Sequence, residues 1–303
     1  MASRIKSVVI PAAGKGTRLL PATKSTPKEL LNIYDRPALQ FAIDEAVDLG
    51  VERIVVVIHP DKAAIRHYLE PDPAYIRALR ASGKAGLAAA LAEIAVPDRI
   101  KTVFAVQEEP LGLGHAVYSA RDLVLPGPFA VLLPDDLILG QPCLSEMAQT
   151  YAHGHMIAAM EVSPAETASY GIFNISGRSI GRSVPVSGMV EKPKAGHAPS
   201  RLAAVGRYIL DPRIFATLRD LPRGAGDEIQ LTDAIARDAE DLALTAFRFS
   251  GTRYDCGNHD GLMDAALARQ AMVKDGSDAK VASAVSGRAK GTVLTGPTAI
   301  AGA

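Results

Sequence analysis

The 303-residue sequence predicts a layered α/β protein with a largely parallel central sheet. Short apolar, β-branched runs alternate along the chain with segments of helical periodicity, and this alternation is typical of right-handed β-α-β crossovers. The runs are continuous rather than alternately polar and apolar, as expected for strands buried on both faces. Strands are therefore predicted at residues 8–10, 53–59, 101–106, 129–133, 156–162 and 242–249.

Helices are expected between these strands. Apolar residues recur at helical spacing between Pro37 and Gly50, where proline suits a first helical turn and glycine a C-terminal stop. Asp227 followed by Gln230 resembles a capping box and predicts a helix over residues 229–239.

The domain organisation follows from changes in composition. One large domain is expected over residues 1–273, with a core at about 5–162. The segment from Ser163 to Arg207 is rich in Gly, Ser and Pro, which predicts a second lobe, about 163–258, at the edge of that core. Residues 274–303 lack periodicity and predict a flexible tail.

Charge and cysteine usage exclude several classes of protein. The chain has 33 basic and 33 acidic residues, so no net charge favours binding to nucleic acid or to a membrane. No segment approaches the ~20 apolar residues of a membrane span, so a soluble protein is expected. Cys143 and Cys256 lack metal-ligand spacing, which predicts reduced thiols in a cytoplasmic protein. His153 and His155 also lack suitable partner ligands and are expected at the surface.

A glycine-rich segment, IPAAGKGTRL at residues 10–19, directly follows the first predicted strand. Two glycines flanking a lysine let the backbone fold closely around an anion and present N–H groups to phosphate oxygens. A tight strand-to-helix turn is the simpler alternative. Arg18, Lys24 and Lys28 crowd the same stretch, however, and this positive charge favours an anion site, with Lys24 expected as a solvated surface residue.

Two common nucleotide motifs do not fit this segment. A dinucleotide-binding loop requires a third glycine where Leu19 stands, which excludes an oxidoreductase of that type. The G-x-x-x-x-G-K-[ST] loop of P-loop nucleotidases is also absent.

The loop, together with TPKELL at residues 26–31, resembles the signature of the sugar-phosphate nucleotidyltransferases. PATKSTPKELL is similar, more closely, to the bacterial uridylyltransferases that act on UTP and glucose 1-phosphate. Further blocks follow in the family's order: Gln107–Val117, Leu132–Asp135, Ser169–Gly171, Val190–Lys194, Pro199–Tyr208, Gly224–Ile235 and Asp255–Asn258. The resemblance implies a three-layer α/β/α, Rossmann-like fold of the nucleotide-diphospho-sugar transferase type, with a mixed, mostly parallel sheet.

The resemblance also assigns the phosphate and metal side of a site. It implies that Arg18 and Lys28 hold the nucleotide phosphates, and that Asp135 and Asp255 bind Mg²⁺. A carboxylate after a strand lies where open α/β sheets bind ligands, and Mg²⁺ commonly takes one or two carboxylates plus phosphate oxygens. Asp136 adjoins the first carboxylate, so which of the two faces the metal stays open.

The remaining assignments concern the base and the sugar. By resemblance, Lys192 approaches the sugar phosphate, and an extended backbone is expected to send it and Glu191 to opposite sides. A carboxylate also suits vicinal sugar hydroxyls because it only accepts hydrogen bonds. The implied nucleotide contacts are Ala13, Gly14, Gly16, Gln107 and Gly112, and the implied sugar contacts are Gly171, Glu191 and Val205.

The reaction implied is the transfer of a uridylyl group from UTP to glucose 1-phosphate. The attacking phosphate is largely dianionic at neutral pH, its second pKa being near ~6, so no general base is needed and the protein must supply alignment and positive charge. A thymidylyltransferase and a non-catalytic regulatory homologue are the alternatives. The resemblance also implies a homo-oligomer, a tetramer or a dimer.

Overall fold

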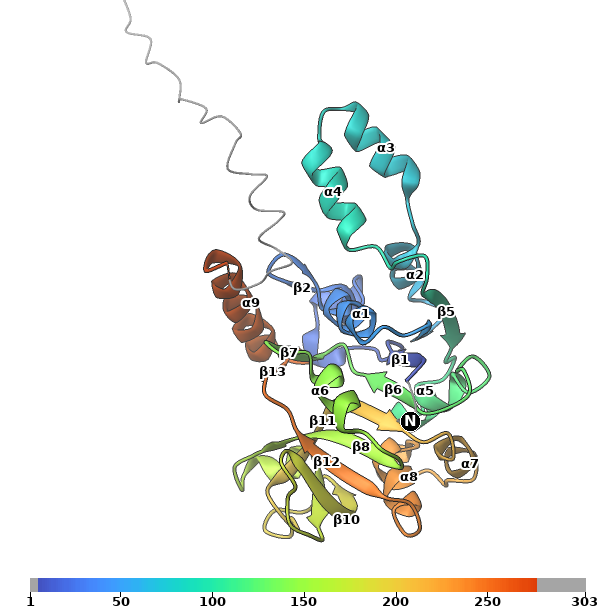
Figure 1. Ribbon diagram of the computed structural model, residues 1–303, viewed down its shortest axis with the longest axis vertical. Coiled ribbons are helices and arrows are strands. Elements are labelled where there is room, and N and C mark those ends of the chain that lie inside the picture. Colours follow the sequence, from blue (N-terminus) through green and yellow to red (C-terminus); the bar gives the residue numbers. More distant parts are fainter. Residues whose placement is uncertain (1–4, 277–303) are drawn as a thin grey trace, which may run out of the picture. The chain divides into compact units, whose positions relative to one another are not determined.

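The computed structural model describes residues 5–276, which divide into two units (Figure 1). The first unit comprises residues up to Glu70 together with Val96–Leu267, and all the predicted site residues belong to it. The predicted tail lies outside the described residues from 277 onward.

The second unit contains residues 71–95 and the chain from 268 on. Its helices α3 (Pro73–Ala81) and α4 (Ala85–Glu93) pack against each other as a hairpin. The Asp72 carboxylate caps α3 by accepting a hydrogen bond from the Tyr75 N–H at 2.8 Å, which satisfies one of the free N–H groups of the first turn.

A nine-stranded sheet forms the centre of the first unit. Its strands, in spatial order, are β5 (Lys101–Val106), β4 (Arg53–Ile58), β1 (Ser7–Pro11), β6 (Phe129–Leu132), β11 (Leu202–Leu210), β8 (His155–Glu161), β12 (Leu244–Arg248), β10 (Ser183–Glu191) and β9 (Gly171–Ile175). Only β11 and β10 run against the others, so the prediction of a mixed, mostly parallel sheet is confirmed for the described chain. The predicted strands all form, within two residues of the expected limits.

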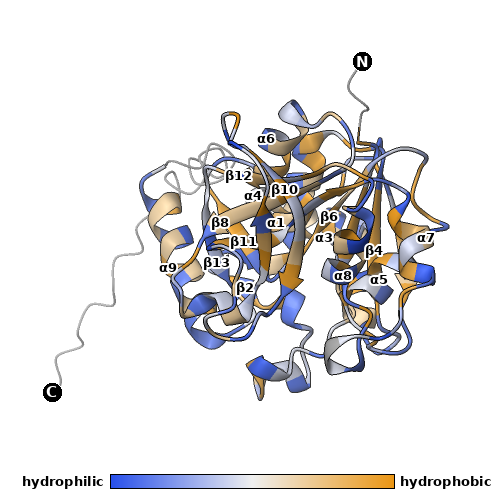
Figure 2. Cartoon of the chain, turned by 90° about the horizontal axis from the view of Figure 1, so that it is seen from below, coloured by the Kyte–Doolittle hydropathy of each residue, from blue (hydrophilic) through white to orange (hydrophobic). Residues whose placement is uncertain are grey.

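Helices cover both faces of the sheet and complete three layers (Figure 2). Successive residues of β1 point to opposite faces: Val8 and Ile10 pack into one apolar core, and Val9 into the other. The first core also takes α1 (Ala38–Leu49), α2 (Ala63–Leu69) and α6 (Cys143–Thr150). The second core takes α5 (Leu113–Ser119), α7 (Ile214–Arg219) and α8 (Leu231–Asp238). The three-layer prediction is therefore confirmed.

Short elements complete the first unit. A ribbon of β7 (Asp136–Leu139) and β13 (Thr252–Asp255) lies outside the main sheet, as does a hairpin of β2 (Asn32–Ile33) and β3 (Arg36–Pro37). Helix α9 (His259–Lys274) follows the ribbon, and its residues from 268 on are counted in the second unit.

The helix predicted after Pro37 is confirmed. Pro37 is the N-cap of α1, and Gly50 ends it in the left-handed conformation with φ 73°. The capping box predicted before residue 229 is wrong. Asp227 has φ 60° and pairs with Arg223 at 2.7 Å, and α8 begins only at Leu231.

The lobe predicted at the edge of the core needs a correction. Strands β9 and β10 do lie at the edge of the sheet, but β11 lies between β6 and β8 in its middle. Its antiparallel course returns the chain into the core, so the segment 163–207 is partly a central strand. The Gly and Ser residues of this segment, which lie in turns and in strands alike, conceal the apolar run at its end.

His155 is buried, which corrects its prediction as a surface residue, whereas His153 is exposed as expected. The His155 Nδ1 accepts a hydrogen bond from the Asp211 N–H at 3.2 Å, so its Nε2 carries the proton and donates to Asp238 at 3.0 Å. Burial opposes ionisation of Asp238, but hydrogen bonds from His155 and Thr217 hold the pKa of this carboxyl below its ordinary value.

Two further expectations from the sequence concern the cysteines and the absence of a membrane span. Cys143 and Cys256 are both buried free thiols. No helix within residues 5–276 is long and apolar enough to cross a bilayer.

Gly154 provides a test of the packing between the segments that lead into β8 and β12. Its φ is 77°, and a Cβ added there would lie 2.1 Å from the Ala243 carbonyl oxygen, which is backbone and cannot give way. Gly154→Ala should lower the free energy of unfolding by about 2–5 kcal/mol, from left-handed strain of about 1–2 kcal/mol and overpacking of about 1–3 kcal/mol. Chemical denaturation measures the loss.

Gly50→Ala is the matched control. Gly50 has nearly the same φ, 73°, but no heavy atom lies within 4 Å of its added Cβ. It should lose only the strain of about 1–2 kcal/mol. An equal loss in both variants would mean that Ala243 imposes no steric constraint.

Candidate functional site

The candidate site begins at β1, where the order of the sheet reverses. From β1 the chain continues to β4 and β5 on one side, and then crosses to β6 on the other. The loops that follow β1 and β6 therefore diverge and leave a crevice at the carboxyl ends of the strands, where open α/β sheets bind ligands. The predicted loop at residues 11–16 and the predicted carboxylate Asp135 both lie at this edge.

The loop is held in one conformation by its glycine and its neighbours. Gly16 has φ 66°, and an added Cβ would lie 3.2 Å from side-chain carbons of both Thr23 and Lys28. Thr23 Oγ1 donates to the Gly16 carbonyl at 2.8 Å. Gly16 is thus required for its backbone conformation and for close packing, in agreement with the prediction that the loop follows a tight path.

Lys28 and Asp135 meet across the crevice. The Lys28 ammonium lies 2.5 Å from Asp135 Oδ2, although the two residues are 107 positions apart. Burial opposes the charged form of Lys28, but Asp135 and Glu29 outweigh it and hold the pKa of the ammonium above its ordinary value. Burial also opposes ionisation of Asp135, yet Lys28 holds the pKa of this carboxyl below its ordinary value. Both groups are therefore charged at neutral pH.

Asp136 has a different environment from its neighbour. Its Oδ2 accepts a hydrogen bond from the Gly206 N–H at 2.6 Å, and its Oδ1 accepts one from Arg253 Nε. Burial raises the pKa of Asp136, against the effect of Arg253. The Asp136 carboxylate is thus bound by two protein donors and its side chain is 12% exposed, whereas that of Asp135 is 23% exposed.

Asp255 reaches the same place from β13. The ribbon pairs Asp255 with Asp136, and the Cys256 N–H donates to the Asp135 carbonyl at 2.7 Å. Asp255 Oδ1 accepts from the Gly257 N–H at 3.0 Å, and an added Cβ on Gly257 would lie 2.7 Å from Arg18 Nη2. The ribbon thus brings Asp255, at the end of β13, next to Asp135, which directly precedes β7, and Arg18 lies beside Gly257.

This donor set fits a magnesium ion that shares its coordination with a substrate. Two carboxylates supply hard oxygen ligands, and Mg²⁺ usually keeps waters or takes phosphate oxygens at its other positions. No group of three or more His, Cys, Asp or Glu residues within 5–276 is placed to hold a metal alone.

Two of the predicted sugar-binding residues lie at strand ends: Gly171 begins β9 and Glu191 ends β10. Glu191 Oε2 accepts a hydrogen bond from Thr232 Oγ1 at 2.7 Å, and an added Cβ on Gly171 would lie 3.2 Å from the same oxygen. Met189 Cε would lie 2.9 Å from the same Cβ, so Gly171 is needed for close packing of its backbone against the Glu191 and Met189 side chains.

Lys192 departs from the expected extended backbone. Its φ is 44°, in the left-handed region, and its ammonium lies 3.5 Å from Glu191 Oε1. The prediction that these side chains diverge is therefore wrong, because β10 ends at Glu191 and the chain turns there. The Lys192 side chain is 61% exposed and free to reach toward a ligand.

Val205 offers its backbone alone to a ligand. Its side chain is 1% exposed and packs in the core between the sheet and α1. The pairing of β11 with β8 shifts register between Ala204 and Tyr208, so the backbone around Val205 leaves the regular ladder. Any contact of Val205 with a sugar must be made by its main chain.

The predicted base-recognition segment packs at the start of α5. Gln107 Nε2 donates to the Gly112 carbonyl at 3.1 Å and lies 3.0 Å from His115 Nδ1. With its amide hydrogens engaged in this way, Gln107 presents Oε1 as an acceptor. Gly112 has φ 94°, and an added Cβ would lie 2.8 Å from Glu228 Cβ, so the Gly224–Ile235 block serves as the support of this segment.

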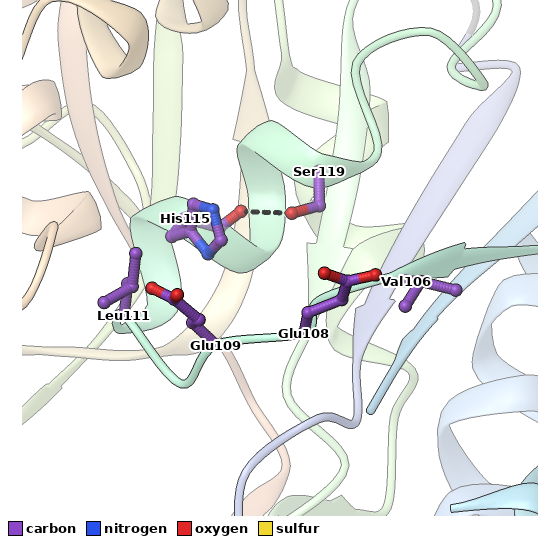
Figure 3. A pocket seen from close by; sticks show the side chains of 6 residues that line it. All are labelled: Val106, Glu108, Glu109, Leu111, His115 and Ser119. Atoms are coloured by element: carbon purple, nitrogen blue, oxygen red, sulfur yellow. Dashed lines mark hydrogen bonds between the residues drawn. The ribbon is translucent and has the colours of Figure 1, made fainter. Parts of the chain in front are cut away.

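A cavity of about 310 Å³ opens beside this segment (Figure 3). It is lined by Val106, Glu108, Glu109, Leu111, His115 and Ser119. Its two carboxylates disfavour a triphosphate, so the anion site is expected at the loop after β1 instead.

Several residues of the site were missed from the sequence. Arg207 is 1% exposed and donates to Glu45 of α1 at 2.8 Å, and Glu45 also accepts from the Leu144 N–H at 2.9 Å. Arg253 Nη1 donates to the Tyr170 hydroxyl at 2.9 Å and so links the carboxylates to the sugar side. The sequence carried no local signal for these pairs, because their members are far apart along the chain.

A family model described as nucleotidyl transferase matches residues 7–271, and the chain belongs to this family. The UTP–glucose-1-phosphate uridylyltransferase of Staphylococcus haemolyticus is 42% identical over 264 residues, which cover 86% of this chain and 90% of that protein. The enzyme of the same name from Bacillus subtilis is 41% identical over 268 residues, covering 87% and 90%.

Solved structures agree with this assignment. A UTP-bound UGPase from Acinetobacter baumannii matches with a TM-score of 0.79 and 38% identity, over 88% of this chain and 93% of that one. A UDP-glucose pyrophosphorylase complexed with UDP-glucose matches with a TM-score of 0.78 and 35% identity, over 88% and 98%. The resemblance seen in the sequence is therefore confirmed.

Proposed function

We propose that this protein transfers the uridylyl group of UTP to α-D-glucose 1-phosphate, giving UDP-glucose and pyrophosphate. The observation that carries the proposal is the Lys28–Asp135 contact of 2.5 Å at the reversal of the sheet. The names of the relatives, uridylyltransferases of glucose 1-phosphate, support the choice of substrates.

The chemistry requires alignment and charge. A sugar-phosphate oxygen attacks the α-phosphorus of UTP, the bond from that phosphorus to the bridging oxygen breaks, and pyrophosphate leaves with the electron pair. The attacking phosphate carries no proton that must be removed at neutral pH, its second pKa being near ~6. Arg18 and Lys28 would stabilise the negative charge on the leaving pyrophosphate, and Lys192 would stabilise the approach of the two anions.

A divalent cation, which we take to be Mg²⁺, supplies further positive charge at the phosphate oxygens when it is bound. Asp135 and Asp255 would hold it. Lys28 keeps Asp135 ionised, and therefore ready to ligate, through the low pKa of that carboxyl.

Base selection is assigned to Gln107. Its Oε1 would accept the imide N–H of uracil, whereas cytosine presents an acceptor at that position and would be rejected. Thymine shares the imide edge, so this contact favours uracil and thymine equally.

We also propose that the protein works in the cytoplasm as a dimer or a tetramer. The resemblance to the family supports the oligomer, and the two buried free thiols suit a reducing compartment.

A pyrophosphate-release assay that crosses four nucleoside triphosphates with several sugar 1-phosphates tests the function. We expect the highest kcat/KM with UTP and glucose 1-phosphate, and little turnover with CTP because of Gln107. A preference for dTTP would make the protein a thymidylyltransferase. Binding of UTP with no release of pyrophosphate for any pair would indicate a regulatory homologue.

Adjacent carboxylates provide a matched test of the metal ligand. Asp135→Asn should lower kcat by about 100-fold or more, comparable to the loss of one preorganised charge-stabilising group, with a smaller change in Tm. Asp136→Asn should act mainly on stability, by about 3–5 kcal/mol, because it breaks the buried pair with Arg253. Near-normal turnover of Asp135→Asn at saturating Mg²⁺ would remove Asp135 from the metal site.

The roles of Glu191 and Lys192 separate in steady-state kinetics. Glu191→Gln can still accept from Thr232 and should chiefly raise KM for glucose 1-phosphate. Lys192→Ala removes a largely exposed side chain, so the fold should persist, and kcat should fall by the equivalent of about 2–4 kcal/mol. If Lys192→Ala changes KM alone, the lysine binds ground state and transition state equally.

A further inference from the structure

Lys62 is a partly buried lysine without an assigned role in the candidate site. It stands between β4 and α2, at the N-cap of that helix, and its side chain is 12% exposed. The helix is anchored by Ile65, which is fully buried in the core beneath it. The position of Lys62 is therefore fixed by the fold and not by the candidate site.

The Lys62 ammonium donates hydrogen bonds to two backbone carbonyls and to the Glu29 carboxylate. The ammonium lies 2.9 Å from the Ala12 carbonyl oxygen and 2.5 Å from that of Gly14, both in the loop after β1. It also lies 2.8 and 3.0 Å from the two carboxylate oxygens of Glu29. Burial lowers the pKa of Lys62, while Glu29 opposes that effect.

These contacts fix the orientation of the two peptide groups that follow Ala12 and Gly14. In a planar trans peptide, the carbonyl of one residue and the N–H of the next point in opposite directions. The only cis peptide bond in the described chain is Leu20–Pro21, so the peptides that follow Ala12 and Gly14 are trans. Because Lys62 draws both carbonyls toward itself, the N–H groups of Ala13 and Lys15 face away from it.

Glu29 connects this arrangement to the rest of the site. Its side chain has no exposed surface, and a buried carboxylate needs a compensating charge, which Lys62 provides. Glu29 also follows Lys28 directly, and the Lys28 ammonium meets Asp135. Lys62 therefore supports both the loop and the segment that carries Lys28.

We propose that Lys62 is a positioning residue for the nucleotide: by holding the Ala12 and Gly14 carbonyls, it turns the N–H groups of Ala13 and Lys15 toward the nucleotide. The proposal rests on the nucleotidyl transfer proposed above. Lys62 does not touch the reacting atoms, and it acts through the loop. Its loss should weaken the binding of UTP and leave glucose 1-phosphate, which is bound from the Glu191 side, nearly unaffected.

A pair of variants isolates the contact with the loop. Glu29→Gln keeps an acceptor for Lys62 Nζ and so keeps the Lys62 side chain at the loop carbonyls, whereas Glu29→Met combined with Lys62→Met removes it. Replacing both members of a buried ion pair by apolar residues is often tolerated by the fold, so the double variant is expected to keep its Tm within a few degrees. We expect the double variant to bind UTP at least 10-fold more weakly than Glu29→Gln in calorimetry, with less than a threefold change in KM for glucose 1-phosphate.

Asp238→Asn controls for instability. It disturbs the buried His155–Asp238 pair, away from the site, and should lower Tm without changing UTP affinity. If the double variant does not fold, Lys62→Arg gives the same comparison, because a planar guanidinium cannot direct its donors at two carbonyls and a carboxylate as an ammonium does. It should weaken UTP binding at least threefold.

The outcomes are distinct. Failure of the wild-type protein to bind UTP would overturn the proposed function. A second outcome is that the wild type binds UTP and the double variant binds it as tightly as its reference protein. In that case Lys62 does not position the loop. The same conclusion holds if Lys62→Arg is used in place of the double variant and binds UTP as tightly as the wild type. Equal increases in KM for both substrates would also overturn the proposal, since they would indicate a general loss of structure.

Discussion

The reversal of strand order at β1 is the constraint on which the rest of the structure depends. The chain places β4 and β5 on one side of β1, and β6 on the other. The loops that leave β1 and β6 cannot close over each other, and a crevice results at the carboxyl ends of these strands. Lys28 and Asp135 approach within 2.5 Å there because their segments both leave the sheet at this edge. The predicted phosphate-binding loop after β1 and the predicted sugar-binding ends of β9 and β10 are thus carried by different strands of one sheet.

Buried charges hold this arrangement together. Arg207 on β11 reaches Glu45 on α1, Arg253 on β13 reaches Asp136 on β7, and Lys62 reaches Glu29. Each pair joins segments that are at least 33 positions apart, and removal of one partner would leave an uncompensated charge in the interior. Apolar packing alone allows adjacent elements to slide, whereas a buried pair with hydrogen bonds is directional. The pairs thus stabilise the relative placement of the groups that must align two anions.

The neighbouring residues Asp135 and Asp136 show how the fold gives different roles to identical side chains. Both follow β6, and both are close to lysine or arginine. Asp136 is bound by a backbone N–H and by Arg253, and burial raises its pKa. Asp135 pairs with the Lys28 ammonium, which holds the pKa of its carboxyl below the ordinary value and can exchange for other cations. The difference lies in the surroundings and not in the sequence position.

The sequence by itself determined the strands and helices whose signals are local. Continuous apolar runs predicted β1, β4, β5, β6, β8 and β12, and Gly50 predicted the end of α1. The motif blocks identified the family and predicted the residues of the site. Tertiary structure alone decided the place of β11 in the middle of the sheet, the burial of His155, the turn at Lys192 and the pairing of Lys62 with Glu29. The physical reason is that hydrophobic periodicity and turn preference act between near neighbours, whereas strand order and charge pairing depend on contacts between residues far apart in the chain.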